Sequence, residues 1–453
     1  MIIDESIIAD GVSVPLLVKL IEKHQREKGD YDLLDRYYCG EHDIKQRSRT
    51  SNNVANNKVV CNHAKYITDM MTAYLVGNPV TYTASEEYDI DALVNEYEEQ
   101  DMANLDSELV KNASVRGRAY ELVYADENSK PRSVCLDPRN AFVVYSNKAT
   151  NKPLFGVHYY KRYNVDGICI GVVCNVYDDT LIMSYESNQD SWATMKLADE
   201  QHHYFGNVPL IEYCNNEEKQ GDFEQLIPLI DAYNILQSDR VNDKEQFVDA
   251  FLFLTGIDLD SEQAKKLREE RILMGYEGAT ASYLAKVMSE SDIEVLKESL
   301  KADIHRFSMV PDLSDENFGS NLSGVAIKYK LMGFEQTVRN KERYMTRSIR
   351  RRLELYVNFL SLKGSMAFVP AYKVQITFTR NMPVNELEVS QMISNLESIV
   401  TDKTLLSQLS FVKNPEAEVK AKVQEQAQKE RLTMDAMNYR DYGKSIKTSE
   451  DEQ

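Results

Sequence analysis

Pro311-Asp-Leu-Ser-Asp-Glu-Asn-Phe-Gly-Ser-Asn-Leu322 is a polar loop, and Ser323-Gly-Val-Ala-Ile-Lys-Tyr-Lys330 opens a long helical pattern directly after it. Apolar residues then recur every three or four positions, which is the spacing of one helix face. They are Ile327, Leu331, Phe334, Val338, Met345, Ile349, Leu353, Tyr356 and Leu360. Ser323 is a typical N-cap and Gly364 a typical stop. The pattern predicts one helix of about 60 Å, longer than a compact domain needs.

This stretch differs in charge from the whole chain. From Ser323 to Gly364 there are ten Lys and Arg and three acidic residues, whereas the 453 residues together carry a net charge of −19. An acidic chain is poorly suited to tight, non-specific binding of nucleic acid over a broad surface. It remains compatible with a protein that lets DNA pass without gripping it. Any function proposed for the chain must therefore account for a basic helix that follows a polar loop.

The composition, with 43% apolar and 28% charged residues, is that of a soluble globular protein. The length predicts about three domains. The longest apolar run is too short for a membrane span, and the N-terminus lacks the basic and apolar regions of a signal peptide. The six cysteines contain no Cys-x-x-Cys pair, so we expect reduced thiols. We expect a cytosolic compartment, which includes the cytoplasm of an infected host, and no membrane.

Helices are predicted for the first 80 residues, and strands come later. Val14–Lys28 and Tyr31–Tyr38 indicate two helices, Val59–Pro79 an amphipathic third, and the acidic segment Glu86–Glu108 also has helical spacing. From Gly117 the alternation of apolar residues predicts a meander of short antiparallel strands. The predicted strands are Arg118–Tyr124, Ser133–Leu136, Ala141–Tyr145, Leu154–Tyr163, Ile168–Tyr177, Leu181–Tyr185 and Pro209–Cys214.

A helical hairpin with a small insert is predicted next. Asp222 can cap a helix to about Phe247, whose second half is polar nearly all round; such a helix bridges domains or packs against copies of itself. The segment Ile293–Ser308 is predicted to be a second helix, which runs back alongside the first. The insert between them holds a strand at Phe251–Leu254, a charged helix at Ser261–Arg271 and a strand at Ser282–Val287. An insert this small cannot build its own core, which points to support from other subunits.

The C-terminal part begins with a predicted strand, Ala371–Arg380, and Pro383 opens a helical region after it. Beyond Arg431 the composition is polar and charged, so we expect a disordered tail to Gln453.

No stretch carries a convincing catalytic or metal-binding pattern. Gly319-Ser-Asn-Leu-Ser-Gly324 has the glycine spacing of a phosphate-binding loop, but Val325-Ala326 follow where that chemistry needs Lys and then Ser or Thr. The acidic residues of Glu86–Glu108 fit a solvated helix face better than a catalytic pair. Histidines at 63, 158, 202 and 203 lack partners at zinc spacing. We expect no catalytic residue, no metal and no cofactor.

Five short motifs follow one another along the chain in an order that indicates a family. They are Asn62-His-Ala-Lys-Tyr-Ile with Tyr74-Leu-Val-Gly-Asn-Pro79; Gly117-Arg-Ala-Tyr-Glu-Leu-Val-Tyr124; His203-Tyr-Phe-Gly-Asn-Val-Pro209; Gly221-Asp-Phe-Glu with Leu229-Ile-Asp-Ala-Tyr-Asn234; and Phe318-Gly-Ser-Asn-Leu-Ser-Gly-Val-Ala326. Together they resemble the portal proteins of tailed bacteriophages, of the siphophage type. No single motif is as specific as a zinc signature, but five in family order are hard to obtain by chance.

The resemblance implies an α+β portal fold and a ring, usually of twelve subunits, at one capsid vertex, through which double-stranded DNA is packaged and ejected. Residues 1–222 and 323–383 would form the wing with its long helix, 223–250 and 289–310 the stem, 251–288 a small α/β clip, 311–322 the tunnel loop, and 384–430 a helical crown. The implied partners are other copies of the chain, DNA, the large terminase, a head-tail adaptor, and the major capsid and scaffolding proteins. The implied location is the virion, with assembly in the host cytoplasm.

Three sets of residues are the site candidates under this resemblance. The tunnel-loop set that meets DNA is Asp312, Ser314, Asp315, Glu316, Asn317, Phe318, Gly319, Ser320, Asn321, Lys328 and Lys330. The stem-channel set is Lys297, Lys301 and Arg306. The subunit-interface set is Arg339, Arg343, Arg347, Arg350, Arg351 and Arg352; the run 350–352 can equally contact phosphates or pair with acidic residues of a neighbouring subunit.

Two other functions compete with this one. An enzyme acting on nucleic acid needs a nucleotide loop or a metal-binding set of acidic residues, and the sequence offers neither, so we expect no enzyme activity. A cytosolic oligomeric scaffold without a DNA role is the alternative that stays open.

Overall fold

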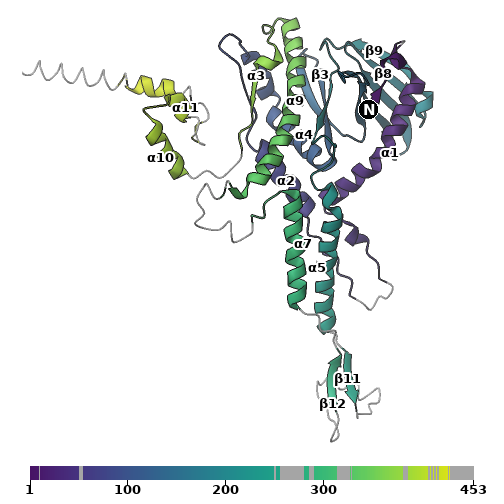
Figure 1. Ribbon diagram of the computed structural model, residues 1–453. Coiled ribbons are helices and arrows are strands. Elements are labelled where there is room, and N and C mark those ends of the chain that lie inside the picture. Colours follow the sequence, from purple (N-terminus) through teal and green to yellow (C-terminus); the bar gives the residue numbers. More distant parts are fainter. Residues whose placement is uncertain are drawn as a thin grey trace, which may run out of the picture. The chain divides into compact units, whose positions relative to one another are not determined.

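The computed structural model describes residues 1–9, 11–49, 55–248, 251–255, 280–284, 290–313, 327, 329–380, 386–406, 409, 412, 415, 418–426 and 428. The fold is a mixture of helices and mainly antiparallel sheets (Figure 1), so the α+β class is confirmed. The chain divides into two compact units, Met1–Asn381 and Met382–Gln453.

A six-stranded sheet forms one layer of the first unit, in the order β1-β5-β6-β7-β8-β9. Its strands are Ile2–Ile3, Ala141–Ser146, Pro153–Tyr163, Cys169–Tyr177, Leu181–Ser187 and Lys196–His202. Only β1 pairs in parallel; the others form the antiparallel meander that the alternation predicted. The edge strand β9 was missed by the sequence reasoning, because all seven of its residues are exposed and show no alternation.

Helix α1 (Val14–Tyr38) supplies Leu17, Leu20 and Ile21 to the core of this sheet. It is one helix, so the prediction of two helices split near Gly29 was wrong. The buried stripe continues past the glycine to Tyr31 and Leu34. Burying that stripe outweighs the cost of about 1 kcal/mol for a glycine inside a helix.

A second sheet, in the order β10-β3-β4, lies beside the long helix α9 (Met332–Lys363). Its strands are Leu210–Cys214, Arg118–Ala125 and Pro131–Leu136. Helices α2 (His63–Val76), α3 (Asp91–Glu99) and α4 (Met102–Arg116) complete this part of the unit. The acidic segment therefore forms two helices, separated by Asp101 in the left-handed conformation, with φ +53°.

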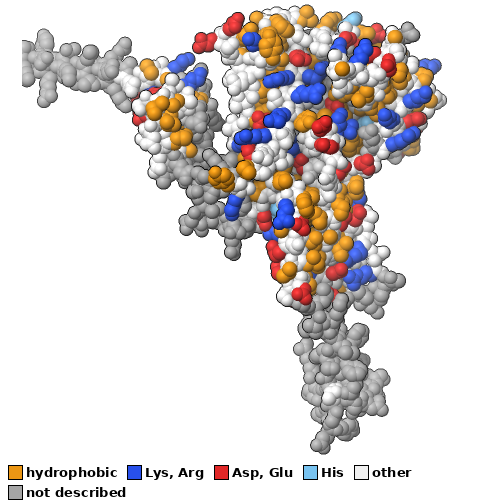
Figure 2. All heavy atoms as spheres, viewed as in Figure 1, with side chains coloured by type: hydrophobic (Ala, Val, Ile, Leu, Met, Phe, Trp, Pro, Cys, Tyr) orange, Lys and Arg blue, Asp and Glu red, His pale blue; other side chains and the backbone are white. Residues whose placement is uncertain are grey.

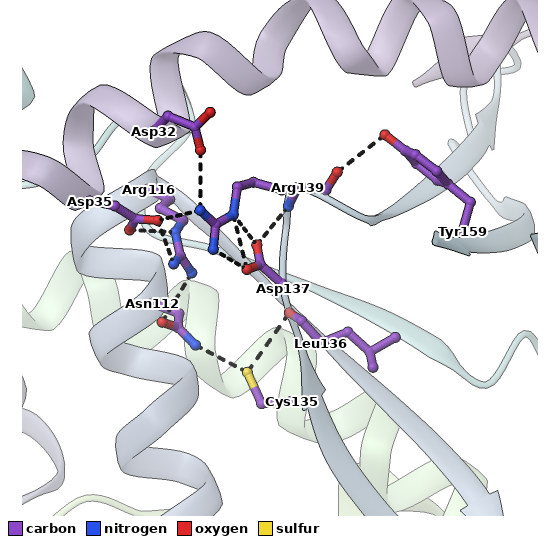
Figure 3. A network of polar contacts seen from close by, with 9 residues as sticks. All are labelled: Asp32, Asp35, Asn112, Arg116, Cys135, Leu136, Asp137, Arg139 and Tyr159. Atoms are coloured by element: carbon purple, nitrogen blue, oxygen red, sulfur yellow. Dashed lines mark hydrogen bonds and ion pairs between the residues drawn. The ribbon is translucent and has the colours of Figure 1, made fainter. Parts of the chain in front are cut away.

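Polar residues join α1 to α4 and to the connection between β4 and β5 (Figure 3). Arg116 binds Asp35 through two hydrogen bonds of 2.8 Å. Arg139 reaches Asp32 at 3.1 Å and Asp35 at 3.2 Å, so Asp35 is shared by both arginines. Tyr159 of the large sheet donates to the Arg139 carbonyl at 3.1 Å. The network links one helix to elements about 100 residues away in the chain.

Helix α9 spans Met332–Lys363 and ends at Gly364, whose φ of +77° is the left-handed conformation that glycine adopts without strain. The predicted stop is confirmed. The predicted start at Ser323 lies outside the described residues. Ile327, Tyr329 and Lys330 are helical, and Leu331 departs from regular helix geometry with ψ of −1°. Helical hydrogen bonds continue through it, because the Leu331 N–H donates to the Ile327 carbonyl at 3.0 Å and the Glu335 N–H donates to the Leu331 carbonyl at 2.8 Å. A helical turn thus precedes the regular helix that begins at Met332.

Helices α5 (Ile227–Val248) and α7 (Glu290–Ser308) form the predicted hairpin and lie side by side (Figure 1). Arg240 of α5 binds Glu290 at 2.7 Å and Glu294 at 3.0 Å, and Lys244 binds Glu290 at 2.9 Å. Between them in the chain, β11 (Phe251–Thr255) pairs with β12 (Thr280–Leu284). Both predicted insert strands thus exist, the second slightly earlier than expected; the predicted helix at Ser261–Arg271 lies outside the described residues.

The polar half of α5 has an explanation within the subunit. Asn234, Ser238 and Asn242 are fully buried, and their side-chain oxygens accept hydrogen bonds from the backbone N–H groups of Cys61, Val59 and Asn57 at 2.7–2.9 Å. Four residues along a helix and two residues along an extended segment both advance about 6 Å. Side chains at every fourth position of α5 can therefore bind the N–H groups of every second residue of the segment. This face of the helix is polar because it binds an extended segment of the same chain.

A short sheet pairs β2 (Thr81–Thr83) with β13 (Gln375–Thr377). The strand predicted for Ala371–Arg380 is therefore shorter than expected. Residues Ala371–Lys373 form a 3-10 turn, with the Lys373 N–H bonded to the Pro370 carbonyl at 2.8 Å. In the second unit, α10 (Glu386–Leu396) and α11 (Asp402–Leu406) are helical, as expected for that region.

Candidate functional site

The segment that follows α7 is fixed to the subunit at its start. Met309 has a φ of +59°, so the chain turns immediately after the helix. The Nζ atom of Lys301 lies 2.6 Å from Oδ2 of Asp312, and the Tyr66 hydroxyl of α2 donates to the Pro311 carbonyl at 2.8 Å. The Nδ1 atom of His305 lies 3.0 Å from the Val310 carbonyl oxygen. Residues up to Leu313 are thus held against both α7 and α2.

His63 packs into the same junction. Its ring centroid lies 4.9 Å from that of Tyr233 and 5.9 Å from that of His305. Burial, with the nearby charges of His305 and Lys301, lowers the pKa of His63 to about 4. The residue is neutral near pH 7 and acts as a packed side chain.

The three stem-channel candidates differ in their surroundings. Lys297 pairs with Glu294, and its Nζ also lies 3.3 Å from Glu298; its side chain is 18% exposed. Lys301 is held by Asp312. Arg306 is 71% exposed and has only a 3.4 Å contact with Asp303 on its own helix. Arg306 is the one with a guanidinium largely open to solvent.

Most of the tunnel-loop set lies outside the described residues, namely Ser314, Asp315, Glu316, Asn317, Phe318, Gly319, Ser320, Asn321 and Lys328. The two described members are Asp312, held by Lys301, and Lys330, which is exposed on the helical turn before α9. Figure 2 shows Lys and Arg side chains gathered over α9.

Four of the interface candidates share the outer face of α9. Arg343, Arg347 and Arg350 are exposed and Arg351 is half-buried. The spacing of four, three and one residues places them on one side of a helix. They line a groove of about 1300 Å³, together with residues of β1, β5 and β10. Arg339, farther along the helix, pairs with Glu335 at 2.9 Å.

Arg352 does not belong to this set, and the prediction that it lies at a subunit interface was wrong. Its side chain has no exposed surface. Its Nη2 atom lies 2.7 Å from Asp106 Oδ1, and its Nε donates to Glu121 Oε1 at 2.8 Å. Burial raises the pKa of Asp106, and the facing arginine opposes that rise. A residue enclosed by its own subunit cannot reach a neighbouring one.

Lys341 makes a second buried ion pair that the sequence reasoning missed. Its Nζ lies 2.5 Å from Asp222 Oδ2 and 2.6 Å from the Ser114 hydroxyl. A signal was present, because Val338, Lys341, Met345 and Arg352 all fall on the three/four spacing of the apolar stripe. A charge on that stripe indicates a buried partner.

In the described part of the chain, no group of three or more His, Cys, Asp or Glu side chains could hold a metal ion. No described helix is both long enough and apolar enough to cross a bilayer.

Comparison with known families then gives a clear match. The model of the family described as "Phage portal protein, SPP1 Gp6-like" matches residues 17–431, nearly the whole chain. This chain belongs to that family of phage portal proteins. The resemblance inferred from the five motifs is confirmed.

Two relatives carry the name "Portal protein". The one from Bacillus phage SPP1 is 26% identical over 442 residues, which cover 91% of this chain and 86% of that protein. The one from Clostridium phage phiCD119 is 26% identical over 231 residues, covering 49% of each chain. A solved structure described as "Neck of empty GTA particle computed with C6 symmetry" aligns with a TM-score of 0.43 and 12% identity, covering 75% of this chain and 86% of that one. None of these descriptions names a catalytic activity.

Proposed function

We propose that copies of this portal protein form a closed ring at one vertex of a phage capsid, and that double-stranded DNA is packaged and ejected through its central channel. The observation that carries this proposal is the family match over residues 17–431. The same ring would be the docking platform for the large terminase and later for the head-tail adaptor. It would assemble in the host cytoplasm with the major capsid and scaffolding proteins.

The described stem supports assembly with other copies. Ile235 of α5 and Val295 and Leu296 of α7 are 46%, 71% and 49% exposed. Figure 2 displays hydrophobic side chains open to solvent along this hairpin. Apolar side chains that line up along two helices favour burial against another protein surface. Stems that pack side by side around a ring would provide that surface through a head-to-tail interface.

The segments keep the roles that the resemblance implies. Residues 1–222 and 323–383 would form the wing, 223–250 and 289–310 the stem, 251–288 the clip and 384–430 the crown. The tunnel loop, residues 311–322, would meet the DNA, with Lys328 and Lys330 beside it. Its second residue, Asp312, is held against the stem helix α7 by Lys301.

A channel needs contacts to the DNA backbone that are few and weak, because each retained phosphate contact adds salt-sensitive affinity. Arg306 is the best-placed stem residue for such a contact, since its guanidinium is largely exposed. Lys297 and Lys301 are already paired with acidic residues, so they would contribute less.

Negative-stain electron microscopy of the purified full chain tests the ring. Closed rings with a central hole are expected. A chain that stays monomeric even with capsid and scaffolding proteins present would overturn the proposal.

Packaging by particles that carry Arg306→Gln tests the channel. We expect rings to assemble normally while DNA packaging or retention changes, and the triple variant Lys297→Gln/Lys301→Gln/Arg306→Gln to change it further. Normal packaging by the triple variant would rule out the stem contacts. A ring whose assembly has no effect on DNA content would instead favour a scaffold without a DNA role.

A further inference from the structure

The outer face of α9 carries positive charges that the subunit itself leaves unsatisfied. Within the described residues, Arg343, Arg347, Arg350 and Arg351 take part in no ion pair or side-chain hydrogen bond, although Arg339, Lys341 and Arg352 on the same helix all do. The four arginines line the groove of about 1300 Å³ beside β1, β5 and β10. A groove lined by unsatisfied guanidinium groups fits carboxylates, which arginine binds through two parallel hydrogen bonds.

The same subunit also carries a surface of exposed acidic residues that have no basic partner in an ion pair within the described residues. Glu86, Glu87 and Asp89 precede α3, and Asp91 and Glu98 lie on it. All five are exposed, and none has an ion pair among the residues that the structure describes. Asp89 accepts one hydrogen bond, from the backbone N–H of Asp91 at 2.9 Å. Glu96 and Glu99, their neighbours on the helix, bind Arg132 and Lys130 within the subunit. The other acidic side chains leave this face with an excess of exposed negative charge, which is complementary to the arginine groove.

The two faces also match in spacing. Asp91 and Glu98 are seven residues apart, and so are Arg343 and Arg350. Seven residues are about two helical turns, or roughly 10 Å, so both pairs lie on one side of their helices at the same separation. Two helices laid against each other could pair both charges at once.

We propose that the acidic face of one copy, residues 86–98, docks into the arginine groove of the next copy. This interface rests on the proposed ring and specifies which surfaces form its wing contact. One surface of the chain would be complementary to a different surface of the same chain, which is the head-to-tail contact that generates a ring.

A segment of protein fits this groove better than the backbone of a nucleic acid does. Glu217, Glu342 and Glu354 also line the groove, and a chain of closely spaced phosphates would meet all of them. Separate carboxylates on a helix can instead pair with arginines and avoid these glutamates.

Two charge-reversal variants of the full chain test the interface. The groove variant is Arg343→Glu/Arg350→Glu, and the acidic-face variant is Glu87→Lys/Glu98→Lys. Asp91 is left unchanged because it lies in the first turn of α3, where an acidic residue stabilises the helix. The matched control is Lys23→Glu/Arg26→Glu on exposed positions of α1, which changes the charge by the same amount as the groove variant.

Each test variant alone should lose rings by about tenfold or more in analytical ultracentrifugation at about 0.1 M salt, because like charges then face each other. The control should form rings as the wild type does. An equal mixture of the two test variants should recover rings, since each altered groove then meets an altered acidic face of the other chain. Only a contact between different copies gives this recovery.

The outcomes separate this interface from the ring itself. Rings formed by both variants alone, or a mixture that stays dispersed, would overturn the interface and leave the proposed function standing. A wild type that never assembles would overturn both. If the groove variant formed rings but lost affinity for a double-stranded oligonucleotide, the groove would be a nucleic-acid site and the proposal would be wrong.

Discussion

The Nζ atom of Lys301 on α7 lies 2.6 Å from Oδ2 of Asp312, in the segment that follows this helix. They are eleven positions apart in the chain, and the chain turns between them at Met309. The pair is partly shielded, with 28% and 22% of the two side chains exposed. It holds Asp312, the second residue of the predicted tunnel loop, against α7.

Replacing Lys301 with Met should loosen this attachment. A partly exposed ion pair contributes about 1 kcal/mol or less, so amide hydrogen exchange in residues 310–313 should accelerate up to about fivefold. Exchange measured by mass spectrometry checks this. Arg306→Met is the control, because Arg306 contacts only its own helix and should leave the segment unchanged. Equal acceleration in both variants would show that the ion pair is not the attachment.

Arg352→Met should destabilise the subunit by about 3–5 kcal/mol, since it leaves the carboxylates of Asp106 and Glu121 buried without a cation. Arg350→Met, two residues away on the exposed face, should change stability by no more than about 0.5 kcal/mol. Urea unfolding of the two variants, compared under conditions that keep the chain unassembled, measures the difference. Similar losses for both would contradict the burial of Arg352.

Gly117→Ala should be far more harmful than Gly167→Ala. Both glycines have positive φ values, +76° and +77°, so both variants carry the same backbone strain of about 1 kcal/mol. A Cβ atom at Gly117 would also lie 1.9 Å from the Lys219 carbonyl oxygen, whereas nothing lies within 4 Å at Gly167. The melting temperatures of the two variants test this. If they fell equally, the close approach of residues 117 and 219 would be refuted.

Stability should fall as the pH drops from about 6.5 toward 4, and His24 should contribute to that fall. Burial and the nearby charge of Arg118 lower the pKa of His24 to about 4, against 6.5 for an exposed histidine. Between these values the unfolded chain binds a proton that the folded chain excludes. The stability that depends on a neutral His24 is complete above pH 6.5 and declines below it.

His24→Gln should therefore reduce the difference in unfolding free energy between pH 7.5 and 5.5 by about 1 kcal/mol. His202→Gln, at an exposed position, should leave that difference as it is in the wild type. Urea titrations at the two pH values provide the measurement. An unchanged pH dependence in His24→Gln would mean that this histidine is not held neutral by the fold.

The sequence by itself determined most of the secondary structure, the hairpin of α5 and α7, the stop at Gly364 and the family. These follow from patterns among residues that are close in the chain, because hydrophobic periodicity and capping are local. The local rules failed where packing overrode them: α1 continues through Gly29, and the exposed strand β9 has no alternation to detect.

Only the tertiary structure decided which charged side chains are buried in ion pairs within the subunit and which are exposed and available to another protein. Arg350 and Arg352 are two residues apart, yet one is exposed and the other is enclosed by Asp106 and by Glu121, which lies 231 positions away. In the same way, the polar face of α5 was explained by backbone groups of residues 57–61. Charge compensation and hydrogen bonding of this kind depend on contacts between distant segments, which no local pattern specifies.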